Sequence, residues 1–181
     1  YLTAFLQNKG WEVSQRDFNI ESYDHFLSAP LLRQAEGLMR KQQQALKAQN
    51  SLSIKEKSHL DVLSIGLKFS DRIIDGVGEA KSVMRTPERF FDFEAYQQAD
   101  MVIKSALKLV SDAYAPAVFS LSTFESGTRA EESTRKAHET TRDIATNPFI
   151  NLYEKNLLST ENWQEYDVVG ISIIGISQII P

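Results

Sequence analysis

Two strand-like segments lie near opposite ends of this chain of 181 residues, and about 140 residues separate them. Residues 11–18 (WEVSQRDF) alternate apolar and polar side chains, which predicts a strand near the edge of a sheet. Residues 167–173 contain the β-branched run VVGIS, which predicts a fully buried strand that is too short to span a membrane. If the two strands are neighbours, the chain must fold around an unusually long connection between them.

The residues between the two segments predict almost only helices. Their expected ranges, together with that of a first helix at the start of the chain, are 1–9, 21–28, 31–49, 53–84, 93–114, 129–145 and a last helix from Asn147-Pro148 onward. Ser53 and Glu56 have the spacing of a capping box, whereas Gly76 and Gly78 are expected to weaken the same helix. Residues 118–127 predict a loop or a very short strand.

The helix expected over residues 93–114 has the clearest apolar face. Its apolar side chains recur at steps of three and four residues: Ile103, Ala106, Leu107, Val110 and Tyr114. We therefore expect this face to be buried.

The first elements of the chain (a helix, Gly10, then a strand) have the order found in the second half of a βαβ unit. We therefore predict an α/β fold: a partial Rossmann-like domain with few parallel strands and a large α-helical insertion, predominantly helical. The expected parts are residues 1–19, a helix and a strand; 20–160, the helical insertion; and 161–181, a strand and the start of a helix. Because Tyr1 lies inside an expected helix, we expect the chain to be part of a longer protein.

Composition excludes several classes of function. The 20 Lys and Arg residues are scattered among 24 Asp and Glu residues, with a net charge of −4, so we expect no nucleic-acid partner. The chain has no cysteine, which excludes disulfides, zinc–thiolate sites and iron–sulfur ligands within it. No apolar run is long enough for a bilayer, and the opening YLTAFL lacks the features of a secretory signal. We expect a cytoplasmic protein without a membrane partner.

Doubly wound folds bind ligands where strands end and helices begin, and five residues occupy such positions here. Ser172 can donate a hydrogen bond to a ligand ring nitrogen, or cap its own turn. Gly175 can let a bulky group approach the backbone, or only serve the turn. Ser177 can present a hydroxyl or a helix amide to a ligand, or only cap the helix. Asp17 and Asn19 follow the other strand, and turn chemistry explains them equally well.

Three separated segments resemble the cobalamin-binding radical S-adenosylmethionine enzymes. YLTAFLQNKGWEVSQRDFNIE resembles the first helix and second strand of the family, and YDVVGISIIGISQIIP resembles its third strand and the start of its third helix. The phrases NPFINLYEKNL and SDAYAPAVFSL are similar to the helical region of one subgroup.

The resemblance implies a Rossmann-like cobalamin-binding domain, followed in the parent chain by a radical S-adenosylmethionine barrel. It implies methylation or a radical rearrangement, with S-adenosylmethionine and a [4Fe-4S] cluster bound outside this segment. Cobalamin and the rest of the parent chain are then the expected partners. In the family, a Ser-x-Leu at the end of the third strand lies against the dimethylbenzimidazole tail. Here that motif becomes Ser172-Ile173-Ile174, with Ile174 in place of Leu.

No other motif indicates catalysis. The three histidines have no metal-ligand spacing, and His138-Glu139 with Asp143 is typical of a solvated helix face. The glycines of residues 75–79 (DGVGE) follow no expected strand, so we do not expect a phosphate loop there. We expect the segment alone not to be an enzyme. Two alternatives remain: a helical protein-interaction module, and a flavodoxin-like or nucleotide-binding domain.

Overall fold

The computed structural model describes residues 2–125, 135, 138–139 and 141–172. In chain order, the principal elements are α1 (Leu2–Asn8), α2 (Phe18–Phe26), α3 (Ala29–Lys47), α4 (Ile54–Arg85), α5 (Pro87–Phe90), α6 (Phe93–Ala113), β1 (Val118–Phe119), β2 (Phe124–Glu125), α8 (Pro148–Leu152), a π-helical turn η2 (Tyr153–Leu157) and a 3-10 turn η3 (Trp163–Glu165). This order confirms the prediction of a predominantly helical chain.

Local sequence signals set most of the helix boundaries. Gly10, two residues after the end of α1, adopts a positive φ of 83°, a conformation in which a residue with a side chain is strained. Pro30 occupies the first turn of α3, as expected for a residue without a backbone donor. Ser53 and Glu56 form the predicted capping box at the start of α4, and the Asn147 side chain accepts the Phe149 N–H at the start of α8.

Helix α4 continues unbroken through Gly76 and Gly78, so the predicted weak point is absent. A glycine inside a helix costs about 1 kcal/mol relative to alanine. The neighbouring side chains Ile74, Val77 and Ala80 are buried, and this packing keeps the segment helical.

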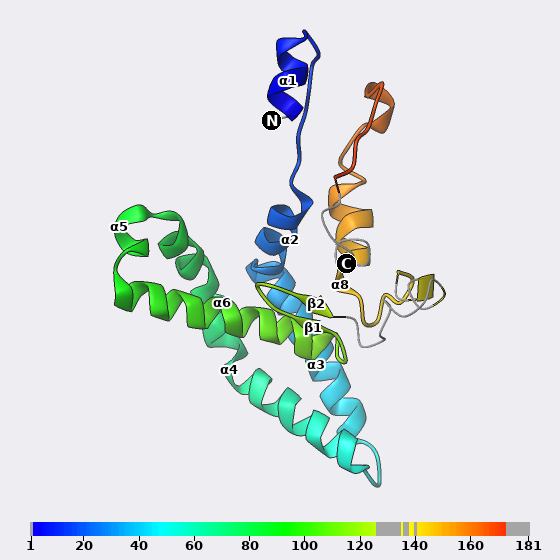
Figure 1. Cartoon of the computed structure of the whole chain (residues 1–181). Coiled ribbons are helices and arrows are strands. Elements are labelled where there is room, and N and C mark those ends of the chain that lie inside the picture. The colour runs from blue at the N-terminus through cyan, green and yellow to red at the C-terminus, as the bar shows by residue number, and fades with distance from the viewer. Residues whose placement is uncertain (1, 126–134, 136–137, 140, 173–181) are drawn as a thin grey trace.

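The core lies where α3, α4 and α6 pack against one another (Figure 1). Leu32 and Met39 of α3 and Leu63 of α4 are fully buried there. The predicted apolar face of α6 is also confirmed, since every residue expected on it is buried. These three helices form the body that carries the rest of the chain.

Aromatic rings join the smaller elements to this body. Phe26 of α2 lies 4.7 Å from Phe119 of β1 and 4.9 Å from Phe149 of α8, measured between ring centroids. Both pairs meet edge to face, a favourable geometry for aromatic rings. Strands β1 and β2 pair antiparallel, with Phe119 opposite Phe124, which confirms the very short strand expected within residues 118–127.

The two predicted long strands are wrong in the described residues. Residues 11–17 belong to no strand, and Phe18, the last residue of that prediction, begins α2. Residues 167–172 also belong to no strand, and Val168 and Ile171 are 77% and 82% exposed instead of buried. The physical reason is that a strand requires a hydrogen-bonded neighbour, and neither segment pairs with one in the described part of the chain. The Rossmann-like assignment stays a prediction.

One predicted helix falls largely outside the described residues. Within the expected range 129–145, the described residues 135, 138 and 139 are helical, whereas residues 141–145 are not. The helix of Pro148–Leu152 follows them and is anchored by the buried Phe149.

Candidate functional site

The linker between α1 and α2 meets the C-terminal part of the chain through Arg16. Its guanidinium donates to Glu21 at 3.0 Å and to Glu161, 145 residues away in sequence, at 2.5 Å. The hydrogen bond with Glu21 is the main reason that the pKa of Arg16 is raised above its ordinary value, and the bond with Glu161 adds to it. The ion pair therefore holds two segments together that the sequence separates widely.

Tyr166 strengthens the same junction. Its hydroxyl donates to Glu161 at 3.0 Å, and this carboxylate raises the pKa of the Tyr166 hydroxyl, while a hydrogen bond with Ser14 acts in the opposite direction. Figure 1 shows α1 and the segment around η3 extending from the same side of the helical body. We call Arg16, Glu161 and Tyr166 the terminal junction.

The residues predicted to contact a cofactor are only partly described. Asp17 is the N-cap of α2, and its carboxylate accepts the backbone N–H groups of Asn19 and Ile20 at 3.0 and 3.1 Å. Ser172 is exposed and lies at the end of the described chain. Of the other predicted positions, Ile174, Gly175 and Ser177 lie outside the described residues.

The described residues among these predicted positions, Asp17 and Ser172, do not by themselves form a site for a buried cofactor tail. No hydrogen bond joins Asp17 to Ser172 among the described contacts, and the Asp17 carboxylate is already used in capping. A Cβ added at Gly170 would meet no atom within 4 Å, so the backbone there is open on that side. A cobalamin tail needs enclosing walls, and these residues supply a hydroxyl but no wall.

A hollow of about 630 Å³ lies between the start of α3 and the C-terminal half of α4. Its cationic groups are Lys81 and Arg85, and both bind the same carboxylate oxygen of Asp24, at 2.7 and 2.6 Å. The hydrogen bond from Lys81 is the main cause of the lowered pKa of Asp24. Asp75, on the rim, is bound by Arg33 at 3.3 Å. Each charged side chain named here therefore already has an ion-pair partner within the fold, although Lys81 and Arg85 share one carboxylate.

A second hollow of about 590 Å³ lies between α6 and the segment around β1. Lys108 on its rim binds Asp112 at 2.7 Å. The Ser111 hydroxyl accepts the Phe119 N–H at 2.8 Å and donates to a backbone carbonyl. These groups fasten β1 to α6, and their hydrogen-bonding capacity is used within the fold.

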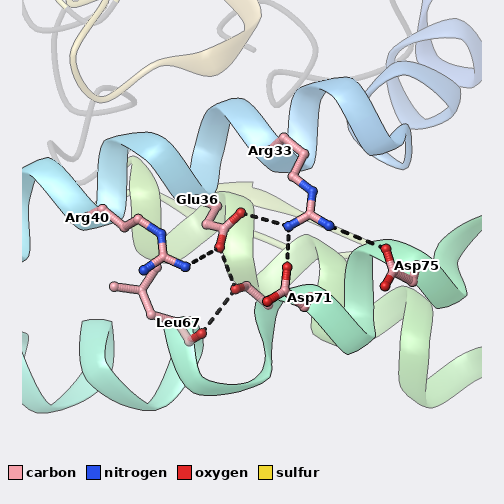
Figure 2. Close-up of polar contacts among 7 residues, drawn as sticks. Arg33, Glu36, Arg40, Leu67, Asp71 and Asp75 are labelled. Atoms are coloured by element: carbon pink, nitrogen blue, oxygen red, sulfur yellow. Dashed lines mark hydrogen bonds and ion pairs between the residues drawn. The ribbon is translucent and has the colours of Figure 1, made fainter.

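Sequence analysis missed a polar network between α3 and α4, centred on the buried Glu36 (Figure 2). One carboxylate oxygen accepts from Arg40 at 2.6 Å and from Ser70 at 2.8 Å, and the other accepts from Arg33 at 3.1 Å. Burial alone would raise the pKa of Glu36, but its three hydrogen-bond donors together lower the pKa below its ordinary value.

Arg33 extends this network across to α4, where it pairs with Asp71 and Asp75 (Figure 2). The spacing of Arg33, Glu36 and Arg40 along one helix is a signal that could have indicated the pairing from sequence. The burial of Glu36 against Ser70 could not have been predicted in that way. Because each charged side chain of this network has an ion-pair partner within the fold, its role is to join α3 to α4.

The described residues contain no cluster of three or more His, Cys, Asp or Glu side chains able to hold a metal ion. Over the same part of the chain, none of the helices combines the length and the apolarity needed to cross a membrane. Residues 75–79 lie within α4, in agreement with the expectation that they form no phosphate loop. No protein-family model, curated protein or solved structure matches this chain.

Proposed function

We propose that this chain is the N-terminal cofactor-binding region of a cobalamin-dependent radical S-adenosylmethionine enzyme. The observation that carries the proposal is the terminal junction, where Arg16 binds Glu161 at 2.5 Å although the whole helical body lies between them in the sequence. Residues 11–17 and 167–172 form no strand in the described part of the chain, but an insertion into a single domain still requires its two ends to lie close together, as they do at the terminal junction. The resemblance of the flanking segments to that enzyme family supports the same assignment.

In this proposal the described residues contribute only part of the cofactor site. Ser172, Ile174, Gly175 and Ser177 would contact one side of the cobalamin tail, together with Asp17. The parent chain supplies the remaining walls, because the described edge is open. The bound cofactors supply the radical or methyl-transfer chemistry, and this segment orients and shields cobalamin. S-adenosylmethionine and the [4Fe-4S] cluster bind outside this cysteine-free segment.

The test is the replacement of Ser172 by leucine in the longer parent protein. A bulky side chain at the tail-contacting position should lower cobalamin occupancy without unfolding the helical body. Occupancy is measured after anaerobic reconstitution, as the corrin absorbance of the gel-filtered protein. Circular dichroism at the same stage reports whether the helices remain intact.

A matched control is Ser51→Leu, which places the same bulk at another exposed serine, between α3 and α4. This variant should retain the cofactor level of the unmodified protein. If Ser172→Leu retains full cofactor, Ser172 does not contact the cobalamin tail. If the segment alone holds cobalamin stoichiometrically, the assignment of residues 172–177 as one edge of a site completed by the parent chain is wrong.

A further inference from the structure

Large aromatic side chains are exposed together where α5 meets α6. Phe91 is 82% exposed, Phe93 73%, Phe90 40% and Tyr96 37%. We call these four residues the aromatic corner. Single exposed apolar side chains are normal, but contiguous aromatic ones are typical of interaction sites.

Three rings of the aromatic corner, those of Phe90, Phe91 and Tyr96, contact one another before any partner binds. Phe90 lies edge to face against both Phe91 and Tyr96, with centroid distances of 5.4 Å in each pair. The Phe90 N–H donates to the Thr86 carbonyl at 2.8 Å, and Arg89 pairs with Glu79 of α4. A preorganised aromatic surface loses little conformational entropy on binding, which favours its use as an anchor.

The charges around the aromatic corner are mainly acidic. Glu88, Asp92 and Glu94 surround the rings in sequence, and the neighbouring cation Arg89 forms its ion pair with Glu79. Glu88 and Glu94 form no ion pair within the described residues, and Glu94 accepts only from the neutral amide of Gln98. A partner that carries lysine or arginine beside its apolar residues would complement this rim.

We propose that the aromatic corner is a docking site for a basic amphipathic helix of another protein. The apolar face of such a helix covers the exposed rings, and its Lys or Arg residues lie against Glu88 and Glu94. The acidic rim disfavours two polyanionic partners, anionic membranes and nucleic acids. The corner lies at the end of the helical body away from α1 and α8 (Figure 1), so this inference is independent of the proposed cofactor role.

The probe is a synthetic, fluorescently labelled helix of leucine and lysine, about 18 residues long so that it can form a stable helix. Its binding to the full chain is followed by fluorescence anisotropy. We expect Phe91→Ser with Phe93→Ser to weaken binding about tenfold, and Glu88→Lys with Glu94→Lys to weaken it similarly. Ile54→Ser is the matched control, because Ile54 is 88% exposed at the start of α4, and it should bind as the unmodified chain does.

The specificity of the site is tested with a second peptide in which glutamate replaces every lysine. This acidic peptide should bind at least about tenfold more weakly, and added salt should weaken the basic peptide. Equal affinity for the two peptides, or an equal loss of affinity in Ile54→Ser and in the phenylalanine variant, would overturn the proposal.

Two further measurements test whether the aromatic corner binds a second copy of the chain or a lipid surface. A positive result in either measurement would also overturn the proposal. Analytical ultracentrifugation shows whether Phe91→Ser with Phe93→Ser abolishes self-association, which would make a second copy of the chain the occupant. Co-sedimentation with phosphatidylcholine vesicles shows whether the rings insert into a lipid surface instead. We expect the unmodified chain to be monomeric and to remain in the supernatant.

Discussion

Replacing Glu36 by glutamine removes the negative charge at the centre of the network between α3 and α4 and leaves the side-chain size unchanged. Glu36 is only 7% exposed, and its carboxylate accepts from Arg33, Arg40 and Ser70. A glutamine has one acceptor oxygen, and its amide donors then face the guanidinium donors of the arginines. The substitution therefore loses charge-assisted hydrogen bonds and introduces mismatched ones.

The structure limits how large this loss can be. A hydrogen bond to a charged group contributes roughly 1.5–3 kcal/mol, and breaking a fully buried ion pair costs more. Here the side chains of Arg33 and Arg40 are 45% and 55% exposed, so water can replace part of what they lose. We therefore expect Glu36→Gln to lower the free energy of unfolding by about 1–3 kcal/mol.

The effect should depend on pH in one direction. The pKa of Glu36 is lower in the folded chain than its ordinary value, so the charged carboxylate stabilises the fold above that ordinary value. This contribution is lost as the pH falls through the folded-state pKa. The difference between the unmodified chain and Glu36→Gln should therefore be largest near neutral pH and should shrink in acid. Arg33, Arg40 and Ser70 are the groups that face Glu36 in this comparison, and Asp71 acts only through its ion pair with Arg33.

The measurement is urea denaturation followed by circular dichroism, at neutral pH and in acid. Glu79→Gln is the matched control, because Glu79 also pairs with an arginine but its side chain is 66% exposed, and we expect no measurable change. The reasoning fails if Glu36→Gln matches this control, or if its effect is the same at both pH values.

Three other substitutions test the local arguments by the same denaturation assay. Leu107→Ala should cost roughly 2–5 kcal/mol because Leu107 is 1% exposed, and a loss below about 1 kcal/mol would contradict its place in the core. Gly78→Ala should stabilise the chain by about 0.5–1 kcal/mol, because a Cβ at this helical position meets no atom within 4 Å. Gly10→Ala should destabilise the chain, because Gly10 has a φ of 83°. A change of stability with the same sign in both variants would contradict this reasoning. Ser53→Ala should cost about 1 kcal/mol by removing the α4 cap, and an unchanged stability would show the cap to be dispensable.

The sequence alone determined the features that depend on neighbours along the chain. The capping box of Ser53 and Glu56, the positive φ of Gly10 and the buried face of α6 were all predictable. Each depends on hydrogen bonds or side-chain contacts between residues three or four positions apart, or on one residue's own backbone freedom. Such interactions form in the same way wherever the helix lies in the fold.

Tertiary structure alone decided the features that join distant residues. Whether residues 11–17 and 167–172 form strands depends on a hydrogen-bonded neighbour, which the alternation of side chains does not supply. The pairing of Arg16 with Glu161 and the burial of Glu36 beside Ser70 likewise depend on how helices pack. Local sequence patterns do not predict these contacts, because the contacts stabilise the chain only after the helices have packed and brought the partner residues together.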